Sequence, residues 1–172
     1  METIETDILV AGGGIAGLAA AARLAATGRR VVVVDPAPEI AGGGEDRRTT
    51  AFLMPSVETL RRAGAWAPMQ AAGAMLRTMR IVDAGGERRA PRETADFAAS
   101  EIQDSPFGWN VPNTAARATL RERVAELPNA ELLAGRAVTD FLARDAHALI
   151  RLSDGRVVRA LLAVAADGRD ST

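Results

Sequence analysis

The chain has 172 residues, which is the size of one ordinary domain and long enough to bury a hydrophobic core. Its 21 basic and 22 acidic residues give a formal net charge of -1, which argues against nucleic-acid binding because such domains normally carry a basic stripe. The chain has no cysteine and only one histidine, His147, which excludes thiolate chemistry and multi-histidine metal sites. We therefore expect a bound cofactor to supply the chemistry, and predict neither a metal site nor a catalytic side chain.

The N-terminal part of the chain predicts a strand–helix–strand unit. An Ile/Leu/Val-rich segment, an alanine-rich helical segment and a run of valines follow one another, at residues 4–10, 15–27 and 30–34. Gly28 is suited to ending the helix. Two parallel strands joined by a helix form a right-handed βαβ unit. The predicted fold class is therefore α/β, with a Rossmann-like unit and a parallel sheet.

The rest of the chain predicts two more helices and several short strands. The helices are expected at residues 56–63 and 114–127, with Ser56 and Asn113 as their N-caps. The second helix is expected to bury Ala118, Leu120, Val124 and Leu127. Strands are expected at residues 76–83, 131–133, 137–142, 147–152, 156–159 and 161–165. The last of these, with a turn at Asp154-Gly155, predict a small antiparallel β-meander beside the parallel sheet.

Three other stretches are predicted from their turn residues and polarity. A hairpin at Gly85-Gly86 is expected to lead into residues 87–90. Residues 91–108 are polar and are expected to be irregular. The loop over residues 37–47 contains a second glycine cluster, Gly42 to Gly44, which we interpret as a flexible loop because no strand precedes it and no helix follows it.

Gly12-x-Gly14-x-x-Gly17 matches the dinucleotide-binding fingerprint at the turn before the first helix. The first glycine allows a tight turn, the second lets the backbone approach a pyrophosphate, and the third lets helix and strand pack closely. The helix begins near Ile15, so its unpaired N–H groups would face the phosphates. Asp35 follows at the end of the second strand, where an acid can accept the hydroxyls of an adenosine ribose.

The fingerprint by itself does not distinguish FAD from NAD. Three interpretations stay open on the residues alone: an FAD-binding protein, a nicotinamide-dependent dehydrogenase or reductase, and a non-catalytic dinucleotide-binding fragment. A nicotinamide dehydrogenase would normally continue with another helix and strand, whereas this chain continues with a loop and Asp46-Arg47-Arg48. The acidic N-terminus and the lack of a long apolar run predict a cytoplasmic protein.

Four segments in chain order resemble the FAD-dependent aromatic-ring monooxygenases, and most of all their ubiquinone-biosynthesis hydroxylase branch. The segments are DILVAGGGIAGLAAA with VVVVDP, Asp46 to Phe52 (similar to D-x-R-x-x-A-L), Phe107 to Asn113 with Arg117 and Leu120, and Ala166 to Ser171 (similar to G-A-D-G-x-x-S). Ala165 departs from the pattern, since the family usually has glycine there. Members of the family are much longer, so we expect residues 1–172 to be the N-terminal, FAD-binding part of such an enzyme. Most of the substrate-domain sheet would be missing, with residues 76–110 contributing to part of it.

The resemblance implies FAD as cofactor, NAD(P)H as co-substrate and O₂-dependent hydroxylation of a small aromatic substrate, a polyprenylated phenol. The isolated chain is expected to bind FAD weakly and to lack hydroxylase activity. A lipid-like substrate is compatible with peripheral membrane contact, whereas nothing indicates the oligomeric state.

Residue by residue, the resemblance implies that the glycine loop cradles the pyrophosphate and that Asp35 binds ribose, the loop residues being Gly12, Gly14, Ile15, Ala16 and Gly17. It further implies that Arg48 and Arg117 line the FAD groove, that the backbone near Val138 meets the adenine, and that Asp167 lies near the pyrophosphate. Simpler interpretations stay open for three of them. Arg48 could pair with Asp46 on a solvated loop, Arg117 could be an ordinary exposed charge, and Asp167-Gly168 could be a plain turn.

Overall fold

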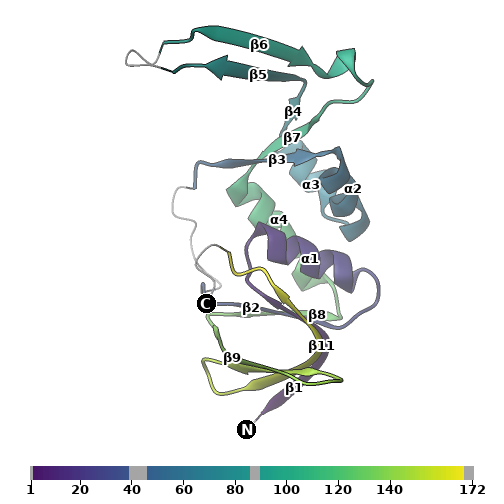
Figure 1. Cartoon of the computed structure of the whole chain (residues 1–172). Helices are drawn as coiled ribbons and strands as arrows, with labels where there is room; N and C mark the ends of the chain where they lie inside the picture. The colour runs from purple at the N-terminus through teal and green to yellow at the C-terminus, as the bar shows by residue number, and fades with distance from the viewer. Residues whose placement is uncertain (1, 39–45, 86–89, 169–172) are drawn as a thin grey trace.

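A six-stranded sheet forms the base of the molecule (Figure 1). The structure is a computed structural model that describes residues 2–38, 46–85 and 90–168. The strand order is β8-β2-β1-β11-β10-β9. Four strands run parallel, namely β1 (Thr3–Ala11), β2 (Val31–Asp35), β8 (Ala130–Ala134) and β11 (Val157–Ala165). Antiparallel β10 (Ala148–Leu152) and β9 (Val138–Ala143) continue the sheet, which confirms the predicted α/β fold with a parallel sheet and a small meander.

Strand β2 is buried along its whole length because the parallel sheet is covered on both faces. Side chains alternate between faces along a strand, so Val31 and Val33 pack in the core beneath the helices. Val32 and Val34 face the opposite side, where they pack with the meander, including Ile150, Leu152 and Val158. The meander therefore curls under the parallel strands and closes a second core.

The helical face of the sheet carries α1 (Ile15–Ala25) and α4 (Asn113–Glu126), with α2 (Met54–Ala63) and α3 (Trp66–Ala71) packed beyond them (Figure 1). Helix α1 ends at Ala25, two residues earlier than predicted, and Gly28 follows with φ +87°. Helix α4 buries Ala116, Leu120 and Val124. The prediction was right for Leu120 and Val124 and wrong for Ala118, which is exposed.

Neither predicted N-cap acts as a cap. Helix α2 begins at Met54 with Leu53 as N-cap and Pro55 in its first turn, where proline fits without losing a helical hydrogen bond. Ser56 therefore lies inside the helix. Asn113 is the first residue of α4 rather than the residue before it, and its side chain bonds to Thr50 and Asp46 instead of to its own helix.

Two small antiparallel sheets lie above the helices (Figure 1). One consists of β3 (Thr49–Leu53), β7 (Gly108–Pro112) and β4 (Ala74–Leu76), in the order β3-β7-β4. The other pairs β5 (Thr78–Asp83) with β6 (Glu93–Ala98), which leads into a short 3₁₀ helix, η1 (Ala99–Glu101). Trp66 of α3 and Trp109 of β7 are buried against each other edge to face, with ring centroids 5.4 Å apart.

Several sequence predictions in this upper part were wrong. The irregular stretch expected over 91–108 contains β6 and η1, and β3, β7 and α3 were not predicted at all. The strand expected over 76–83 divides at Arg77. The partner of β5 is β6 rather than residues 87–90. Residues 86–89, which include the predicted turn residue Gly86, lie outside the described residues. The predicted loop glycines Gly42 to Gly44 also lie outside them.

In the C-terminal part, the strands expected at 156–159 and 161–165 form one continuous strand, β11. This strand pairs in parallel with β1 along its length, from Thr3 opposite Val157 to Ala11 opposite Ala165. The long register explains why no break occurs between the two predicted strands.

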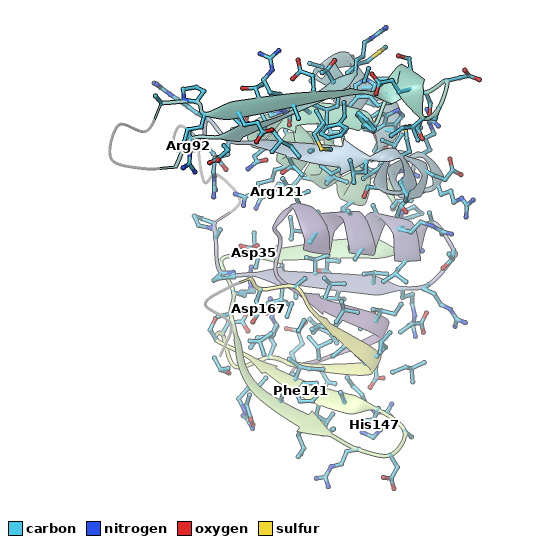
Figure 2. All side chains as sticks on the ribbon, turned by 45° about the horizontal axis from the view of Figure 1, so that its top comes forward. Asp35, Arg92, Arg121, Phe141, His147 and Asp167 are labelled. Carbon is cyan, nitrogen blue, oxygen red and sulfur yellow. The ribbon has the colours of Figure 1, made fainter. Side chains whose placement is uncertain are left out.

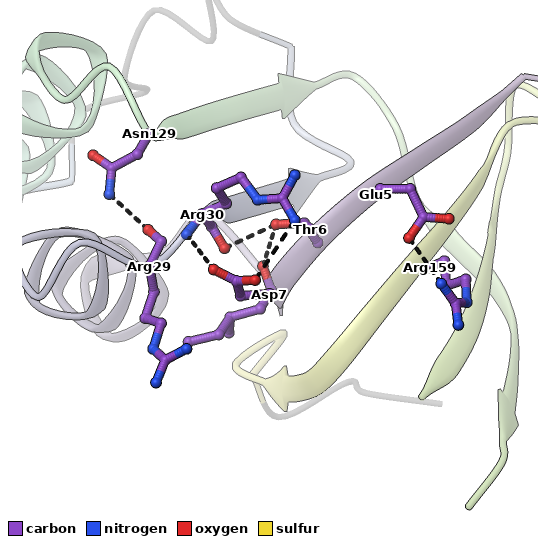
Figure 3. A network of polar contacts seen from close by, with 8 residues as sticks. Glu5, Thr6, Asp7, Arg29, Arg30, Asn129 and Arg159 are labelled. Atoms are coloured by element: carbon purple, nitrogen blue, oxygen red, sulfur yellow. Dashed lines mark hydrogen bonds and ion pairs between the residues drawn. The ribbon is translucent and has the colours of Figure 1, made fainter. Parts of the chain in front are cut away.

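A network of polar contacts joins the middle of β1 to the residues just before β2 and β8 (Figure 3). The Thr6 hydroxyl donates to the carbonyl oxygen of Arg30 at 2.8 Å, and the backbone N–H of Arg30 donates to the carboxylate of Asp7 at 2.9 Å. The amide of Asn129 donates to the carbonyl oxygens of Ala25 and Arg29. These bonds fix the chain between α1 and β2 to its neighbours. No helix among the described residues is long and apolar enough to cross a membrane.

Candidate functional site

The turn between β1 and α1 packs against the end of β11. Gly12 has φ +112°, which favours glycine, and its N–H donates to the carbonyl oxygen of Val34 at 2.7 Å. A Cβ at residue 12 would lie less than 3.0 Å from the backbone of Ala166. The N–H of Ala166 in turn donates to the carbonyl oxygen of Ala11 at 2.7 Å. The first glycine of the fingerprint therefore lets the loop lie directly against the chain that leaves β11.

Gly17 and Gly14 have opposite surroundings. A Cβ at residue 17 would overlap the carbonyl oxygen of Gly12, so Gly17 allows the first turn of α1 to pack on the loop. A Cβ at residue 14 would have no atom within 4 Å. Gly14 is the N-cap residue of α1, and no side chain caps the helix. Open space therefore lies in front of a helix N-terminus, whose N–H groups and dipole favour an anion.

Asp35 ends β2 and turns its carboxylate toward the glycine loop. The residue is 8% exposed, with Oδ2 accepting the N–H of Gly13 and Oδ1 accepting the N–H of Ala37 at 2.7 Å. A Cβ at residue 13 would collide with this carboxylate, so Gly13 is needed as well, although the fingerprint does not include it. Each carboxylate oxygen has lone pairs for further donors, which leaves Asp35 able to accept ligand hydroxyls.

The connection between β8 and β9 lies beside Asp35. The N–H of Arg136 donates to the carbonyl oxygen of Asp35 at 3.0 Å, and that of Gly135 donates to the carbonyl oxygen of Ala37 at 2.9 Å. Val138 then begins β9 and packs against the second core. The backbone before Val138 is therefore held next to Asp35 at the edge of the sheet.

Asp167 is exposed just after β11, and Figure 2 places it at the same edge of the sheet as Asp35. The glycine loop, Asp35, the β8–β9 connection and the Asp167 segment follow the carboxyl ends of β1, β2, β8 and β11. Ligands of open parallel sheets bind outside these ends. The structure thus brings together the residues from four distant parts of the sequence that were predicted to meet a dinucleotide.

The two predicted arginines lie in other elements. Arg48 forms a two-point ion pair with Asp46, with Nε to Oδ1 at 2.8 Å and Nη2 to Oδ2 at 2.9 Å. This pair holds the pKa of the Asp46 carboxyl well below its usual range and raises the pKa of Arg48. Arg48 therefore pairs with Asp46, as the simpler interpretation expected. This pairing does not test whether Arg48 also lines the FAD groove. Arg117 is exposed on α4 and has no hydrogen bond or ion pair within the ranges that the structure describes.

A pocket of about 430 Å³ adjoins the first turn of α1. Its lining is uncharged and comes from α1, β3 and α2, namely Ile15, Ala16, Ala19, Thr50, Ala51, Phe52, Ser56, Thr59 and Leu60. Sequence reasoning placed Ile15 and Ala16 at the cofactor but did not single out Thr50 and Phe52. Their position just after Arg48, in the segment similar to D-x-R-x-x-A-L, could have indicated that they lie near the cofactor.

Comparison with known proteins decides between the kinds of dinucleotide-binding protein. Residues 5–172 match the family described as FAD binding domain. The chain belongs to this family. This assignment favours FAD over the nicotinamide-dependent dehydrogenase that the fingerprint alone left open.

Relatives of this FAD-binding domain include two hydroxylases. The chain is 36% identical over 168 residues to the ubiquinone hydroxylase UbiL of Rhodospirillum rubrum, covering 96% of this chain and 38% of the relative. It is 28% identical over 172 residues to the ubiquinone hydroxylase UbiM of Neisseria meningitidis, covering 98% and 37%. The chain therefore spans less than half the length of either hydroxylase.

Solved structures share the fold of the domain. The p-nitrophenol 4-monooxygenase PnpA of Pseudomonas putida matches with a TM-score of 0.79 and 26% identity, over 100% of this chain and 43% of that one. The flavin-dependent monooxygenase PieE, solved in complex with FAD and substrate, matches in fold with a TM-score of 0.77 and 23% identity, over 99% and 31%.

The residues present fit a bound dinucleotide. The space beyond Gly14 would admit a phosphate against the helix N-terminus, and no acidic side chain lines the adjoining pocket to repel it. The buried carboxylate of Asp35 is fixed by two backbone N–H groups near that space. The chain thus has a helix N-terminus open to an anion and a buried carboxylate able to accept hydroxyls at the same edge of the sheet, which fits a dinucleotide.

Proposed function

We propose that this chain binds FAD and serves as the FAD-binding part of a flavin-dependent aromatic hydroxylase. The observation that carries the proposal is the contrast among the three glycines of the fingerprint. Gly12 and Gly17 are enclosed by backbone, whereas Gly14 faces open space at the N-terminus of α1. Of the three, only Gly14 is not required to be glycine by the packing of the protein. In the proposal, its missing side chain instead lets a ligand approach the backbone. The family match supports FAD as that ligand.

The proposed roles of the individual residues follow from their places at the sheet edge. In the proposal, the N–H groups of Ile15 and Ala16 receive the pyrophosphate, and Asp35 accepts the ribose hydroxyls. The adenine would lie against the backbone before Val138, which is bonded to the Asp35 segment. Arg48, Arg117 and Asp167 would border the rest of the cofactor.

The proposed reaction is the NAD(P)H- and O₂-dependent hydroxylation of a phenolic ring. When bound, FAD supplies the redox chemistry and oxygen activation that this reaction needs, so the protein must bind, orient and exclude water. The ubiquinone hydroxylases among the relatives support a polyprenylated phenol as the substrate class. A lipid-like substrate of this kind would be compatible with peripheral membrane contact.

We also propose that residues 76–110 contribute to the substrate side of the protein. Strands β5 and β6 form an exposed ribbon in which Met79 opposes Phe97 and Ile81 opposes Ala95 on one face. The other face carries the Arg80–Asp96 ion pair, at 2.7 Å. The apolar face of this ribbon would be covered in a protein with a larger substrate-binding sheet.

Nucleotide selectivity tests the proposed function. The purified chain would be titrated with FAD, FMN and NAD while the fluorescence of the flavins, or displacement of bound FAD by NAD, is followed. We expect FAD to bind more tightly than FMN, since FMN lacks the adenosine that Asp35 and the Val138 segment would contact, and NAD to compete poorly. Equal affinity for FAD and FMN, or binding of NAD in preference to FAD, would overturn the proposal.

A further inference from the structure

Asn113 joins the first turn of α4 to the segment that leads into β3. Its side-chain N–H donates to Oδ2 of Asp46 at 3.2 Å, and its side-chain oxygen accepts the Thr50 hydroxyl at 2.7 Å. Its backbone N–H donates to the carbonyl oxygen of Arg48 at 3.0 Å. One residue thus makes three hydrogen bonds to alternate positions of a five-residue segment, 46–50. We call residues 46, 48, 50 and 113 the Asn113 clamp.

Within the Asn113 clamp, Asp46 fixes the direction of the Arg48 guanidinium. Asp46 accepts the backbone N–H of Arg48 at 3.1 Å as well as two N–H groups of its side chain. The Arg48 side chain is 79% exposed, so apart from this pair it would be free to sample many rotamers. A two-point pair between guanidinium and carboxylate is directional, so the orientation of the carboxylate sets that of Arg48. The amide of Asn113 in turn holds the carboxylate.

The Asn113 clamp also borders the proposed cofactor site. Thr50, whose hydroxyl bonds Asn113, lines the same pocket as Ile15 and Ala16 of the first turn of α1. A shift of Thr50 would therefore move the pocket wall that faces the helix N-terminus. The hydrogen bonds of Asn113 therefore hold both the pocket wall at Thr50 and, through Asp46, the side chain of Arg48.

We infer that Asn113 is a positioning residue for the cofactor: through Asp46 and Thr50 it holds Arg48 and the β3 wall of the pocket ready for the anionic dinucleotide. The inference rests on the proposed FAD function. It assigns to Asn113 a role at the ligand site in place of the helix-capping role expected from its position in the sequence. It also predicts that Asp46, although negatively charged, favours binding of an anion.

A first experiment needs no cofactor. Amide hydrogen exchange of residues 46–50 would be compared in wild type, N113A and N129A. Asn129 is a matched control because its side-chain amide also makes two hydrogen bonds, in this case to the backbone carbonyl oxygens of Ala25 and Arg29, away from the 46–50 segment. We expect exchange of the 46–50 segment to rise about tenfold in N113A, as loss of its bonds allows local opening, and to be unchanged in N129A. Unchanged exchange in N113A would overturn the inference.

A second experiment separates positioning from general stability. The Kd for FAD would be measured for N113A in the wild-type and R48Q backgrounds. We expect N113A to raise the Kd about five- to tenfold in wild type and only about two- to threefold in R48Q, because the part of the effect that passes through Arg48 is absent there while the part that passes through Thr50 remains. N129A should leave the Kd unchanged. An equal effect of N113A in both backgrounds would contradict the inference and leave the FAD function standing.

The D46N variant tests the direction in which the Kd for FAD changes, and this test does not depend on whether N113A folds. Simple charge repulsion predicts that removing a carboxylate near an anionic ligand strengthens binding. The Asn113 clamp predicts the reverse, a Kd raised about threefold or more, because Arg48 loses its charged partner and its fixed direction. Tighter FAD binding by D46N would overturn the inference. If wild type itself took up no FAD, the proposed function would fail first, and the inference with it.

Discussion

Gly14 is the N-cap of α1 and Gly17 lies in its first turn, three residues later, but a side chain would meet very different surroundings at each. The carbonyl oxygen of Gly12 occupies the place of a Cβ at residue 17, whereas residue 14 has open space and φ -73°, which any residue adopts. The spacing of the fingerprint in the sequence does not distinguish the roles of these two glycines. The structure makes Gly17 a packing glycine, whereas Gly14, which no packing contact requires, is the one that we propose to face the ligand.

Gly17→Ala should therefore destabilise the protein strongly. We expect the free energy of unfolding to fall by about 2–3 kcal/mol, because the added methyl group forces α1 away from the loop. Gly14→Ala, the matched control, should cost less than about 1 kcal/mol, the ordinary penalty for alanine at an N-cap. Urea unfolding of the two variants measures both values, and equal losses would contradict the packing role of Gly17.

Asp154 provides a pH-dependent contribution to stability at the β10–β11 turn. Its carboxylate accepts bonds from Arg156 and Arg136, and these, Arg156 first, lower the pKa of Asp154 from 3.8 to about 2. A lowered pKa in the folded state stabilises the protein above the unfolded pKa, and this stabilisation is lost as the pH falls through the folded pKa. The contribution should therefore be complete at neutral pH and disappear between about pH 4 and pH 2.

Asp154→Asn should lower the Tm slightly at neutral pH, since exposed ion pairs contribute little, and the difference from wild type should vanish near pH 2. Thermal unfolding followed by circular dichroism from neutral pH to pH 2 measures the difference. Asp145→Asn, in the exposed β9–β10 connection, serves as the control. A difference between wild type and Asp154→Asn that stayed constant down to pH 2 would refute the assignment.

The role of a residue could be predicted from the sequence where that role depends on neighbouring residues in the chain. Gly12 and Gly17 are examples, because the fingerprint records the steric demands of one local turn. Asn113 is the opposite case. Its position before a helical segment predicted an N-cap, but its partners Asp46 and Thr50 lie more than sixty residues away and come close only in the folded chain.

At the scale of elements, the buried run of valines made β2 predictable, whereas the exposed β6 was missed. Strand β2 consists of valines that end at Asp35 and is buried on both faces. Strand β6 is exposed over all but its last residue, so its sequence lacks the apolar alternation that normally indicates a strand. Pairing with β5, rather than burial, fixes its structure.

The Trp66–Trp109 contact joins α3 to β7 and should couple the two elements energetically. Replacing each tryptophan by leucine, alone and together, gives a double-mutant cycle. We expect a coupling energy of about 0.5–1.5 kcal/mol for the edge-to-face pair, beyond the loss of buried area in each single variant. Chemical unfolding measures the four stabilities. Additivity within about 0.3 kcal/mol would show that the rings merely fill space.

At the scale of the whole molecule, the carboxyl ends of four parallel strands bring the predicted site together. Separate sequence motifs at Gly12, Asp35, Val138 and Asp167 become neighbours because β1, β2, β8 and β11 lie in one parallel sheet. The βαβ unit was predictable from local pattern, whereas the joining of β11 to β1, across most of the chain, depends on tertiary pairing. The family match explains why four such motifs occur together.

FAD binding by wild type and by Gly14→Val tests the central claim most directly. Ala125→Val is the matched control, because it adds the same side chain at an exposed position of α4. Flavin fluorescence titration of the three proteins should give a Kd raised at least about tenfold in Gly14→Val, where the side chain fills the space meant for a phosphate, and within about twofold of wild type in Ala125→Val. Equal affinities in all three proteins would contradict the account.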